Sequence, residues 1–382
     1  MKYAIDTSSL KESLNYLIVQ GNISKFNRRS CITQITFKQD VIVLNTESSQ
    51  ILSQINLFSK SDSDEEDYSN ILFVDSLMFR QLVNSLDSDT IIIEPNESGF
   101  YVYSGNSSFT FPKVVDTDEF VLDKPSEEIA DYSGATIMFS ASNWDYVKNH
   151  QLYAISSSIS NPVCTYVWIG KDGSVLVGDL DNGIFTHSYK NTLPGKCLLT
   201  PSIINLLSIL PDYCNIVDYE DSYGIYFKDD NKHYEFLGHI FPKNEDSESV
   251  GSYNSDIILS TFDVTTCFID IDVSKLYKFI TQSVILSDSN NNTVTLSYAN
   301  NVLTIEQGDS KCDISISGGS SSTFSMDFNA SWIKKILSNY SKLDTIKATS
   351  VLSMGVKYTD DEAVGLVLRS PDDLTTVIAS IE

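Results

Sequence analysis

The chain has 382 residues, of which 42% are hydrophobic, and it carries a formal net charge of −25 at pH 7. At about 100–200 residues per domain, this length predicts two to four domains, each with enough apolar material for its own core. Such an acidic surface as a whole repels DNA and anionic lipid, so any contact with nucleic acid has to be local.

No run of about 18 apolar residues is present, and the opening MKYAIDTSSL lacks the apolar core of a signal peptide. We therefore expect a cytoplasmic protein that does not span a membrane. The cysteines show no C-x-x-C spacing, which argues against a disulfide framework and against a zinc site. We expect buried thiols at Cys31, Cys164, Cys197, Cys214, Cys267 and Cys312.

Motifs of the common enzyme classes are missing. The tripeptide at Gly195 to Cys197 has a lysine but lacks the upstream glycine and the hydroxyl of a phosphate-binding loop. The four histidines show no H-E-x-x-H spacing, and no Gly-x-Ser-x-Gly elbow occurs. Because the abundant acidic residues lie in loops, where solvation explains them, we predict a protein that is not an enzyme and binds no metal or cofactor.

In chain order, the sequence first predicts a strand at residues 2–5 and a helix at residues 8–20, which Gly21 ends. The alternating stretches ITQITFKQDVIVLNTE and ILSQINLF predict antiparallel strands. Residues 59–69 form an acidic loop by composition. The segment SGFYVYSGNSSFTFP predicts a hairpin whose second strand has two phenylalanines on one face.

A unit of strand, helix and returning strand occurs three times, at residues 73–93, 198–219 and 325–347. Each helix begins at a polar residue suited to cap it, namely Asp75, Thr200 or Asn329. These entry residues are 125 and then 129 positions apart, a period that indicates tandem domains rather than a solenoid. In the third copy the returning strand is expected at Thr345 and Ile346.

The remaining elements follow the same plan. A second early helix is expected at residues 142–155 and a third in DVSKLYKFITQSVILS, each followed by short antiparallel strands. Two linkers rich in acidic residues and serine separate the copies. We predict an α+β protein of three tandem domains, with two helices and antiparallel sheets in each, at residues 1–124, 134–243 and 257–382.

At low identity, essentially the whole chain resembles the bacterial-type β sliding clamp, the processivity subunit of replicative DNA polymerase. The segment FNASWIKKIL resembles the start of that family's last helix, and SVILSDSNNNTVTL resembles its Ile-Leu-Ser helix end and next strand. SGNSSFTFP, with the pair Glu119 and Phe120, resembles the end of the first clamp domain. The resemblance implies a head-to-tail dimer, a ring of six domains whose twelve helices surround duplex DNA.

A sliding ring should hold DNA topologically, with an acidic exterior and mildly basic helices. The six predicted helices carry seven basic against three acidic residues, although a solvated helix face explains any single lysine as well. The second helices of domains one and two have Leu77, Met78, Ser202 and Ile203 where the family commonly has basic residues. The candidate DNA-binding residues are Lys11, Lys25, Arg28, Arg29, Arg80, Lys148, Lys275, Lys278, Lys334 and Lys335.

Two further sites are carried over from the resemblance. The dimer interface would use Phe109 and Phe111 of domain one against Ile285 and Leu286 of domain three, although all four could be ordinary core residues. The pocket that binds peptides of the polymerase and the clamp loader would be formed by Val163, Ile184, Phe185, Pro242, Val377, Ile378 and Ala379.

This pocket departs from the family pattern. Asp181, Asn182 and Gly183 match its Asp-Gly turn, but Ile184 replaces a usual basic residue and the chain ends in ASIE. A phage or mobile-element clamp with its own polymerase would fit that divergence. The alternative function is a triplicated β-rich structural or interaction protein, such as a virion component, that does not bind DNA.

Overall fold

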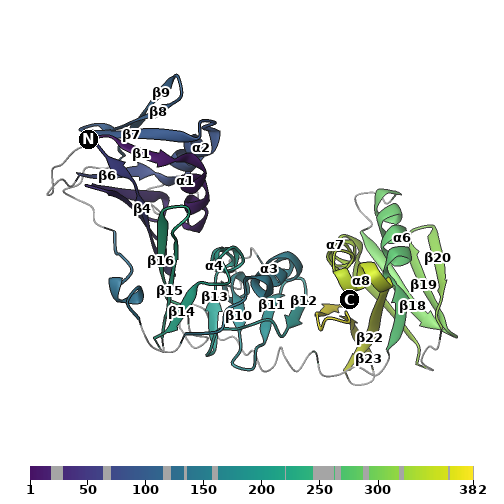
Figure 1. The fold of residues 1–382 in the computed structure, drawn as a ribbon. Coiled ribbons are helices and arrows are strands. Elements are labelled where there is room, and N and C mark those ends of the chain that lie inside the picture. The colour runs from purple at the N-terminus through teal and green to yellow at the C-terminus, as the bar shows by residue number, and fades with distance from the viewer. Residues whose placement is uncertain are drawn as a thin grey trace. The chain divides into compact units, whose positions relative to one another are not determined.

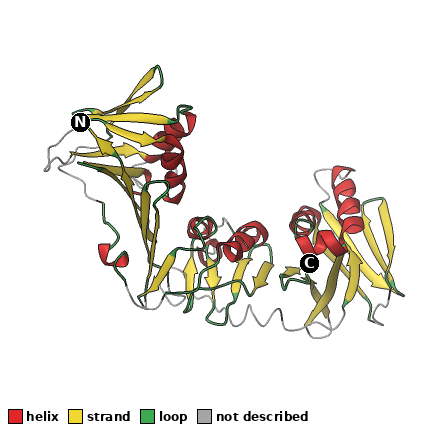
Figure 2. Ribbon diagram, in the orientation of Figure 1, coloured by secondary structure: helices red, strands yellow, loops and turns green. Residues whose placement is uncertain are grey.

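The structure is a computed structural model that describes residues 1–18, 29–62, 70–114, 122–132, 136–156, 162–219, 221–243, 262, 268–286, 292–317, 322–359 and 362–381. Antiparallel sheets with helices packed against them make up the chain, which confirms the predicted α+β class (Figures 1 and 2). The chain divides into two compact units. The first comprises Met1–Ser142, Thr192–Pro194 and Ser202–Lys243, and the second Asn143–Asn191, Gly195–Pro201 and Asn244–Glu382.

The first unit contains two antiparallel sheets. The five-stranded sheet has the order β5-β1-β7-β8-β9 and the seven-stranded sheet the order β14-β15-β16-β4-β3-β2-β6. Their strands are β1 (Tyr3–Asp6), β2 (Ile32–Lys38), β3 (Val41–Glu47), β4 (Ile51–Phe58), β5 (Lys60–Ser61), β6 (Asn70–Asp75), β7 (Thr90–Asn96), β8 (Gly99–Ser104), β9 (Ser107–Pro112), β14 (Asn215–Asp218), β15 (Tyr223–Asp229) and β16 (Tyr234–Ile240). Its helices are α1 (Thr7–Ser13), η1 (Leu14–Tyr16), η2 (Arg29–Cys31), α2 (Ser76–Ser85), η4 (Glu127–Ile129) and α4 (Pro201–Leu207). The first residue of α4, Pro201, is assigned to the second unit.

Capping and aromatic packing explain the local structure of this unit. Asp75 caps α2 by accepting a hydrogen bond from the backbone N–H of Met78 at 2.8 Å, as predicted. The helix then buries Phe79 against Phe100 and Phe111, whose ring centroids each lie 5.8 Å from its own. The same core explains why the hairpin of β8 and β9 forms where it was predicted.

The second unit also contains two antiparallel sheets. The eight-stranded sheet has the order β13-β10-β11-β12-β24-β23-β22-β17 and the four-stranded sheet the order β20-β19-β18-β21. Their strands are β10 (Val167–Ile169), β11 (Val175–Asp179), β12 (Ile184–Ser188), β13 (Cys197–Leu199), β17 (Ile269–Asp272), β18 (Thr293–Ala299), β19 (Val302–Gln307), β20 (Ser310–Ser315), β21 (Phe324–Asn329), β22 (Val351–Thr359), β23 (Glu362–Arg369) and β24 (Thr375–Ala379). Its helices are η5 (Leu152–Ala154), η6 (Pro162–Thr165), α6 (Val273–Leu286), α7 (Ala330–Tyr340), α8 (Asp344–Thr349) and α3 (Ala141–His150), whose first two residues are assigned to the first unit.

Helix α7 has the predicted cap and the predicted buried stripe. The Asn329 side chain accepts a hydrogen bond from the N–H of Trp332 at 3.2 Å, and Ile333 and Leu337 are buried. At its last residue, the buried Tyr340 hydroxyl donates to a carbonyl oxygen of Leu368 at 3.0 Å and lies 2.9 Å from the Thr376 hydroxyl. This helix is therefore fixed to β23 and β24 at its C-terminal end.

Two predicted elements are wrong. The first helix does not reach residue 20, because Leu17 has an extended backbone and α1 and η1 end at Tyr16. Thr345 and Ile346 lie in helix α8 and not in a returning strand, which begins only at Val351. Ile346 is buried in the core although it lies on a helix, because tertiary packing outweighs the weak strand preference of a β-branched residue.

Several predictions lie outside the described residues. These are Lys25, Arg28, Cys267, most of the acidic loop at residues 59–69, and the pair Glu119 and Phe120. Of the described cysteines, four are buried free thiols and Cys312 is half-buried on β20. The domain boundaries stay predictions.

Candidate functional site

The strand pair β12 and β24 gathers most of the predicted peptide-pocket residues. Ile184 pairs with Ile378, and Phe185 pairs with Val377. Because side chains alternate along a strand, the isoleucines and the Phe185–Val377 pair lie on opposite faces of the sheet. Thr376, on the face of Ile378, contacts the hydroxyls of Tyr153 and Tyr340, so that face lies against the helices.

On the opposite face, Phe185 and Val377 belong to a buried apolar group, here named the Phe185 cluster. Its members are Val163, Cys164, Trp168, Leu176, Phe185, Leu198, Phe262, Val367 and Val377. The ring of Phe185 lies over Gly178, where an added Cβ would approach its Cδ1 to 2.3 Å. Burial raises the pKa of the Cys164 thiol, as expected for an apolar site. Of the predicted pocket residues, Val163, Phe185 and Val377 therefore lie in one cluster. Ile184 and Ile378 lie on the opposite face of the sheet.

The predicted Asp-Gly turn lies next to this pair of strands. Asp179 Oδ1 accepts hydrogen bonds from the N–H groups of Asp181 at 3.0 Å and Asn182 at 3.3 Å. Gly183 has a φ of 61°, and the N–H of Ala379 donates to its carbonyl oxygen at 2.9 Å. A Cβ on Gly183 would lie 2.6 Å from that of Ala379. Glycine is thus favoured at position 183 for two reasons, its positive φ angle and its close approach to the Ala379 side chain.

Trp332 is a neighbour of this turn that sequence reasoning left in the helix core. Its indole Nε1 donates to Asn182 Oδ1 at 3.2 Å, and the side chain is half-buried. Lys335 Nζ lies 4.4 Å from the centroid of the Trp332 ring and donates to the Tyr153 carbonyl oxygen at 3.0 Å. A tryptophan in the first turn of an amphipathic helix is the sequence signal that could have identified this residue.

Pro242, another predicted pocket residue, is half-buried and belongs to the first unit.

Two of the predicted dimer residues lie on an edge strand, and the other two lie at the end of helix α6. Strand β9 is the last strand of the five-stranded sheet, and β20 is the last of the four-stranded sheet. Phe109 is 40% exposed, whereas Phe111 is buried and its ring stacks 5.2 Å from Phe100. Ile285 is 73% exposed near the end of α6. The position of Leu286 is described but its side chain is not, so an exposed apolar side chain is established at Phe109 and Ile285 only.

Two of the predicted DNA-binding residues, Arg80 and Lys11, make hydrogen bonds to backbone carbonyl oxygens within the first unit. Arg80 Nη2 donates to the carbonyl oxygens of Leu14 at 2.5 Å and Leu17 at 2.6 Å, and burial lowers its pKa. Lys11 Nζ donates to the Leu86 carbonyl oxygen at 2.6 Å. Arg80 and Lys11 therefore hold the ends of helices within the first unit.

Arg29, also in the first unit, is exposed and pairs with Glu47 at 3.0 Å and more loosely with Asp123 at 3.9 Å. Surface pairs of this kind are weak and leave a cation accessible. Its two neighbours in the predicted loop, Lys25 and Arg28, lie outside the described residues.

The remaining cations are more accessible. Lys275, Lys278 and Lys335 are exposed, and Lys148 and Lys334 are half-buried. Lys275 makes a loose ion pair with Asp272 at 3.8 Å. Within the bounds of α1, α2, α3, α4, α6 and α7 the sequence has seven basic and two acidic residues, because Asp75 lies just before α2. The excess of positive charge on the helices is thus slightly larger than the sequence predicted.

Other kinds of site were searched within the described residues. No group of three or more His, Cys, Asp and Glu side chains there could hold a metal ion. Among the same residues, no helix is both long and apolar enough to cross a membrane.

Neither a protein-family model nor a curated protein sequence matches the chain. Solved structures do. The DNA polymerase III β subunit of Thermotoga maritima has a TM-score of 0.77 and 12% identity, covering 100% of this chain and 99% of its own. The sliding clamp of Bartonella birtlesii bound to griselimycin has a TM-score of 0.74 and 12% identity, covering 100% of both chains. The Helicobacter pylori β clamp bound to a DNA ligase peptide has a TM-score of 0.68 and 14% identity, again covering 100% of both. Over its full length, this chain has the α+β fold of the bacterial β sliding clamps.

Proposed function

We propose that this protein is a DNA sliding clamp, a non-enzymatic ring that encircles duplex DNA and tethers the replicative polymerase. The observation that carries the proposal is the match to clamp structures over 100% of this chain. The proposed ring is a head-to-tail homodimer, and each chain contributes three domains with boundaries near residues 124, 134, 243 and 257. It would act in the cytoplasm, loaded by a separate protein.

Exposed apolar residues beside two open sheet edges support ring closure. Phe109 on β9 and Ile285 at the end of α6 are the predicted contact residues that solvent reaches. Pairing the β9 edge of one chain with the β20 edge of another would remove two exposed edges and bury both side chains. Phe111 supports this contact from inside the first unit, since it fixes β9 to the core.

The accessible lysines support a local contact with DNA. Lys275, Lys278, Lys334 and Lys335 lie on α6 and α7, which pack together in the second unit. Arg80 and Lys11 are engaged by backbone carbonyls, so we propose that they position helices while the lysines of α6 and α7, with Lys148, face the phosphates. A few loose contacts permit sliding, because each tight phosphate contact would anchor the ring.

The Phe185 cluster and the adjacent turn support the docking of partner peptides. The Bartonella birtlesii clamp is bound to griselimycin and the Helicobacter pylori clamp to a DNA ligase peptide. We propose that peptides of this protein's polymerase and loader bind beside Val377, Ala379 and Gly183. Ile184 lies on the opposite face, so it does not line this site, and the divergence of the region would fit a phage or mobile-element clamp with its own polymerase.

Retention on DNA of different topology tests the proposal without a loader. A variant carrying Phe109→Cys and Ile285→Cys is mixed with nicked circular or linear plasmid and bridged with a bismaleimide. Gel filtration at high salt then removes charge-mediated binding. A clamp stays on the circle and is lost from the linear plasmid. Equal loss from both, or equal retention, would contradict the proposal and favour the structural alternative. Met138→Cys paired with Ile285→Cys is the control, since Met138 is 89% exposed and lies outside β9 and its sheet.

A further inference from the structure

Phe262 is the one member of the Phe185 cluster that lies on no helix or strand. Its side chain is 5% exposed, and its ring centroid lies 5.4 Å from the imidazole of His187. His187 follows Phe185 by two residues on β12, so both point to the same face of the sheet. Phe262 therefore covers the face on which the predicted peptide residues Phe185 and Val377 lie.

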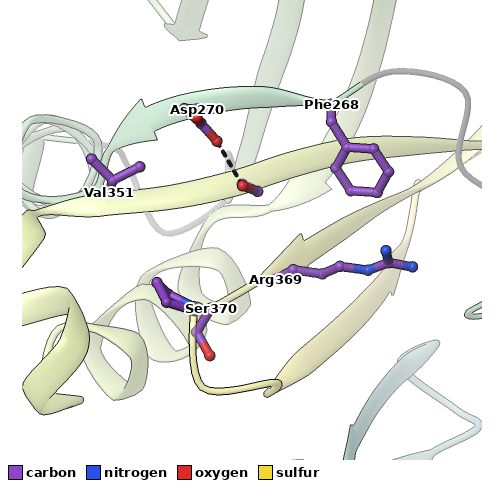
Figure 3. A pocket seen from close by; sticks show the side chains of 7 residues that line it. Phe268, Asp270, Val351, Arg369 and Ser370 are labelled. Carbon is purple, nitrogen blue, oxygen red and sulfur yellow. Dashed lines mark hydrogen bonds between the residues drawn. The ribbon is translucent and has the colours of Figure 1, made fainter.

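Arg369 holds Phe262 in this position. Its Nη2 donates to the Phe262 carbonyl oxygen at 3.1 Å, and its guanidinium carbon lies 4.9 Å from the ring centroid of Phe268. Figure 3 shows the Arg369 side chain running past the ring of Phe268 and away from Asp270, which accepts a hydrogen bond from Ser353. Among the described residues Arg369 has no ion pair, so its contacts in this region are to a backbone carbonyl and a ring.

Open space adjoins the covered face. A pocket of about 430 Å³ is lined by residues that include Phe262, His187, Arg369 and Thr375, and Arg369 also lines a second pocket of about 470 Å³. The first pocket lies within the range of small-ligand sites. Ser174 and Asp172 also line this pocket. Phe262 thus lies between a packed apolar cluster and an open polar pocket, and it contacts both.

We propose that Phe262 is a built-in ligand of the Phe185 cluster, held by Arg369, and that the apolar anchor of a partner peptide docks by displacing it. The inference rests on the proposed docking function. When a site is open for only a fraction of the time, the apparent dissociation constant of its ligand equals the intrinsic constant divided by that fraction. A covered site therefore binds its ligand more weakly than an open one. Loss of Phe262 therefore raises affinity, and the merged cluster and pocket accept a larger anchor.

Thiol labelling tests the cover itself and needs no partner. Cys164 belongs to the cluster and is 3% exposed, so the cover should protect it. With N-ethylmaleimide and peptide mapping, Phe262→Ala should label at Cys164 about tenfold faster than wild type, and Arg369→Gln by a smaller factor. Phe58→Ala is the matched control, because Phe58 is 41% exposed and lies in the first unit, whereas Arg369 and the cluster belong to the second. Cys197 is the internal reference thiol on the opposite face of β13. An unchanged rate at Cys164 in Phe262→Ala overturns the proposal.

Calorimetry with griselimycin then distinguishes two roles of Phe262, either a side chain that must move before the ligand binds or a fixed part of the binding site. The affinity of Phe262→Ala should be about tenfold higher than that of wild type if Phe262 must move. A lower or equal affinity means that Phe262 is a wall of the site, which also overturns the proposal. If griselimycin binds no form of the protein, the proposed docking function fails, whereas Cys164 labelling still decides whether Phe262 is a cover.

Discussion

The seven-stranded sheet of the first unit and the eight-stranded sheet of the second use the same strand pairing but differ in the chemistry of one face. In the first, β16 pairs with β4 and places Leu237 opposite Gln54. In the second, β24 pairs with β12 and places Val377 opposite Phe185. Each of these pairs lies on the face turned away from the helices, as Tyr16 packs on the other face beside Phe236.

That face is polar in the first unit and apolar in the second. Gln54 Nε2 donates to Asn56 Oδ1 at 3.0 Å, and Asn56 Nδ2 donates to Glu235 Oε1 at 2.5 Å, which forms a polar ladder across β4 and β16. Gln54 is also opposite Asn45 on β3. At the matching place in the second unit lies the Phe185 cluster. One backbone arrangement thus carries a mainly polar face in one unit and an apolar face, suited to an apolar anchor, in the other.

The largest effect expected from this comparison is at Phe185. Replacing it with alanine should lower the free energy of unfolding of the second unit by about 3–5 kcal/mol, because a buried ring is lost and a cavity remains over Gly178. Gln54→Ala, at the matching position, should cost only about 1 kcal/mol for one hydrogen bond. Urea unfolding followed by hydrogen exchange in each unit measures both. Equal costs would show that the two faces are equally packed.

Asn45 should give a change of opposite sign. It is fully buried on β3, and neither its Oδ1 nor its Nδ2 has a hydrogen-bond partner. Asn45→Leu removes an unsatisfied amide without changing shape much, so it should raise the stability of the first unit by about 1–2 kcal/mol. The urea midpoint of Asn45→Leu, compared with that of Thr36→Val on the same face, checks this. A loss of stability would mean that the amide is hydrogen-bonded in solution.

The polar ladder itself should be worth less. Asn56→Ala breaks the hydrogen bonds to Gln54 and Glu235, and we expect a loss of about 1 kcal/mol, since Glu235 remains partly solvated. The thermal midpoint should fall by a few degrees, with Glu235→Gln falling less. If neither variant changes the midpoint, the ladder forms without contributing to stability.

The smallest effect is a pH dependence from His239, on the same face as Leu237. Burial lowers its pKa below 6.5, while its Nε2 lies 2.8 Å from the Ser222 hydroxyl. The unfolded chain therefore takes up the proton first as pH falls, so stability is fully present above pH 6.5 and declines below it, down to the folded pKa. His239→Gln should flatten this decline. His150, whose pKa is also lowered by burial, gives the second unit a similar slope that His239→Gln leaves intact.

Most of the fold could be predicted because its signals are local. The cap at Asp75 followed by apolar residues at helical spacing, and the same at Asn329, fix two helices whatever lies around them. The error at Ile346 has the converse reason. A β-branched residue favours a strand only weakly, and burial on α8 outweighs that preference.

The candidate site was predicted less well. Resemblance supplied Phe185 and Val377, but it did not distinguish them from Ile184 and Ile378, which face the helices. The structural role of Arg80 was also invisible in the sequence, because the carbonyl oxygens of Leu14 and Leu17 that it binds lie more than 60 positions away. Basic residues on a helix look alike until the neighbouring elements are known.

The sequence by itself determined the α+β class, the repeated strand and helix, the helix caps and the excess of acidic over basic charge. These depend on side-chain period and on residues a few positions apart. Only the tertiary structure decided that β24 pairs with β12, that the Phe185 cluster lies on the face away from the helices, and that Phe262 covers it. Each of these joins segments far apart in the chain, and local periodicity reports that a side chain is buried but not against what.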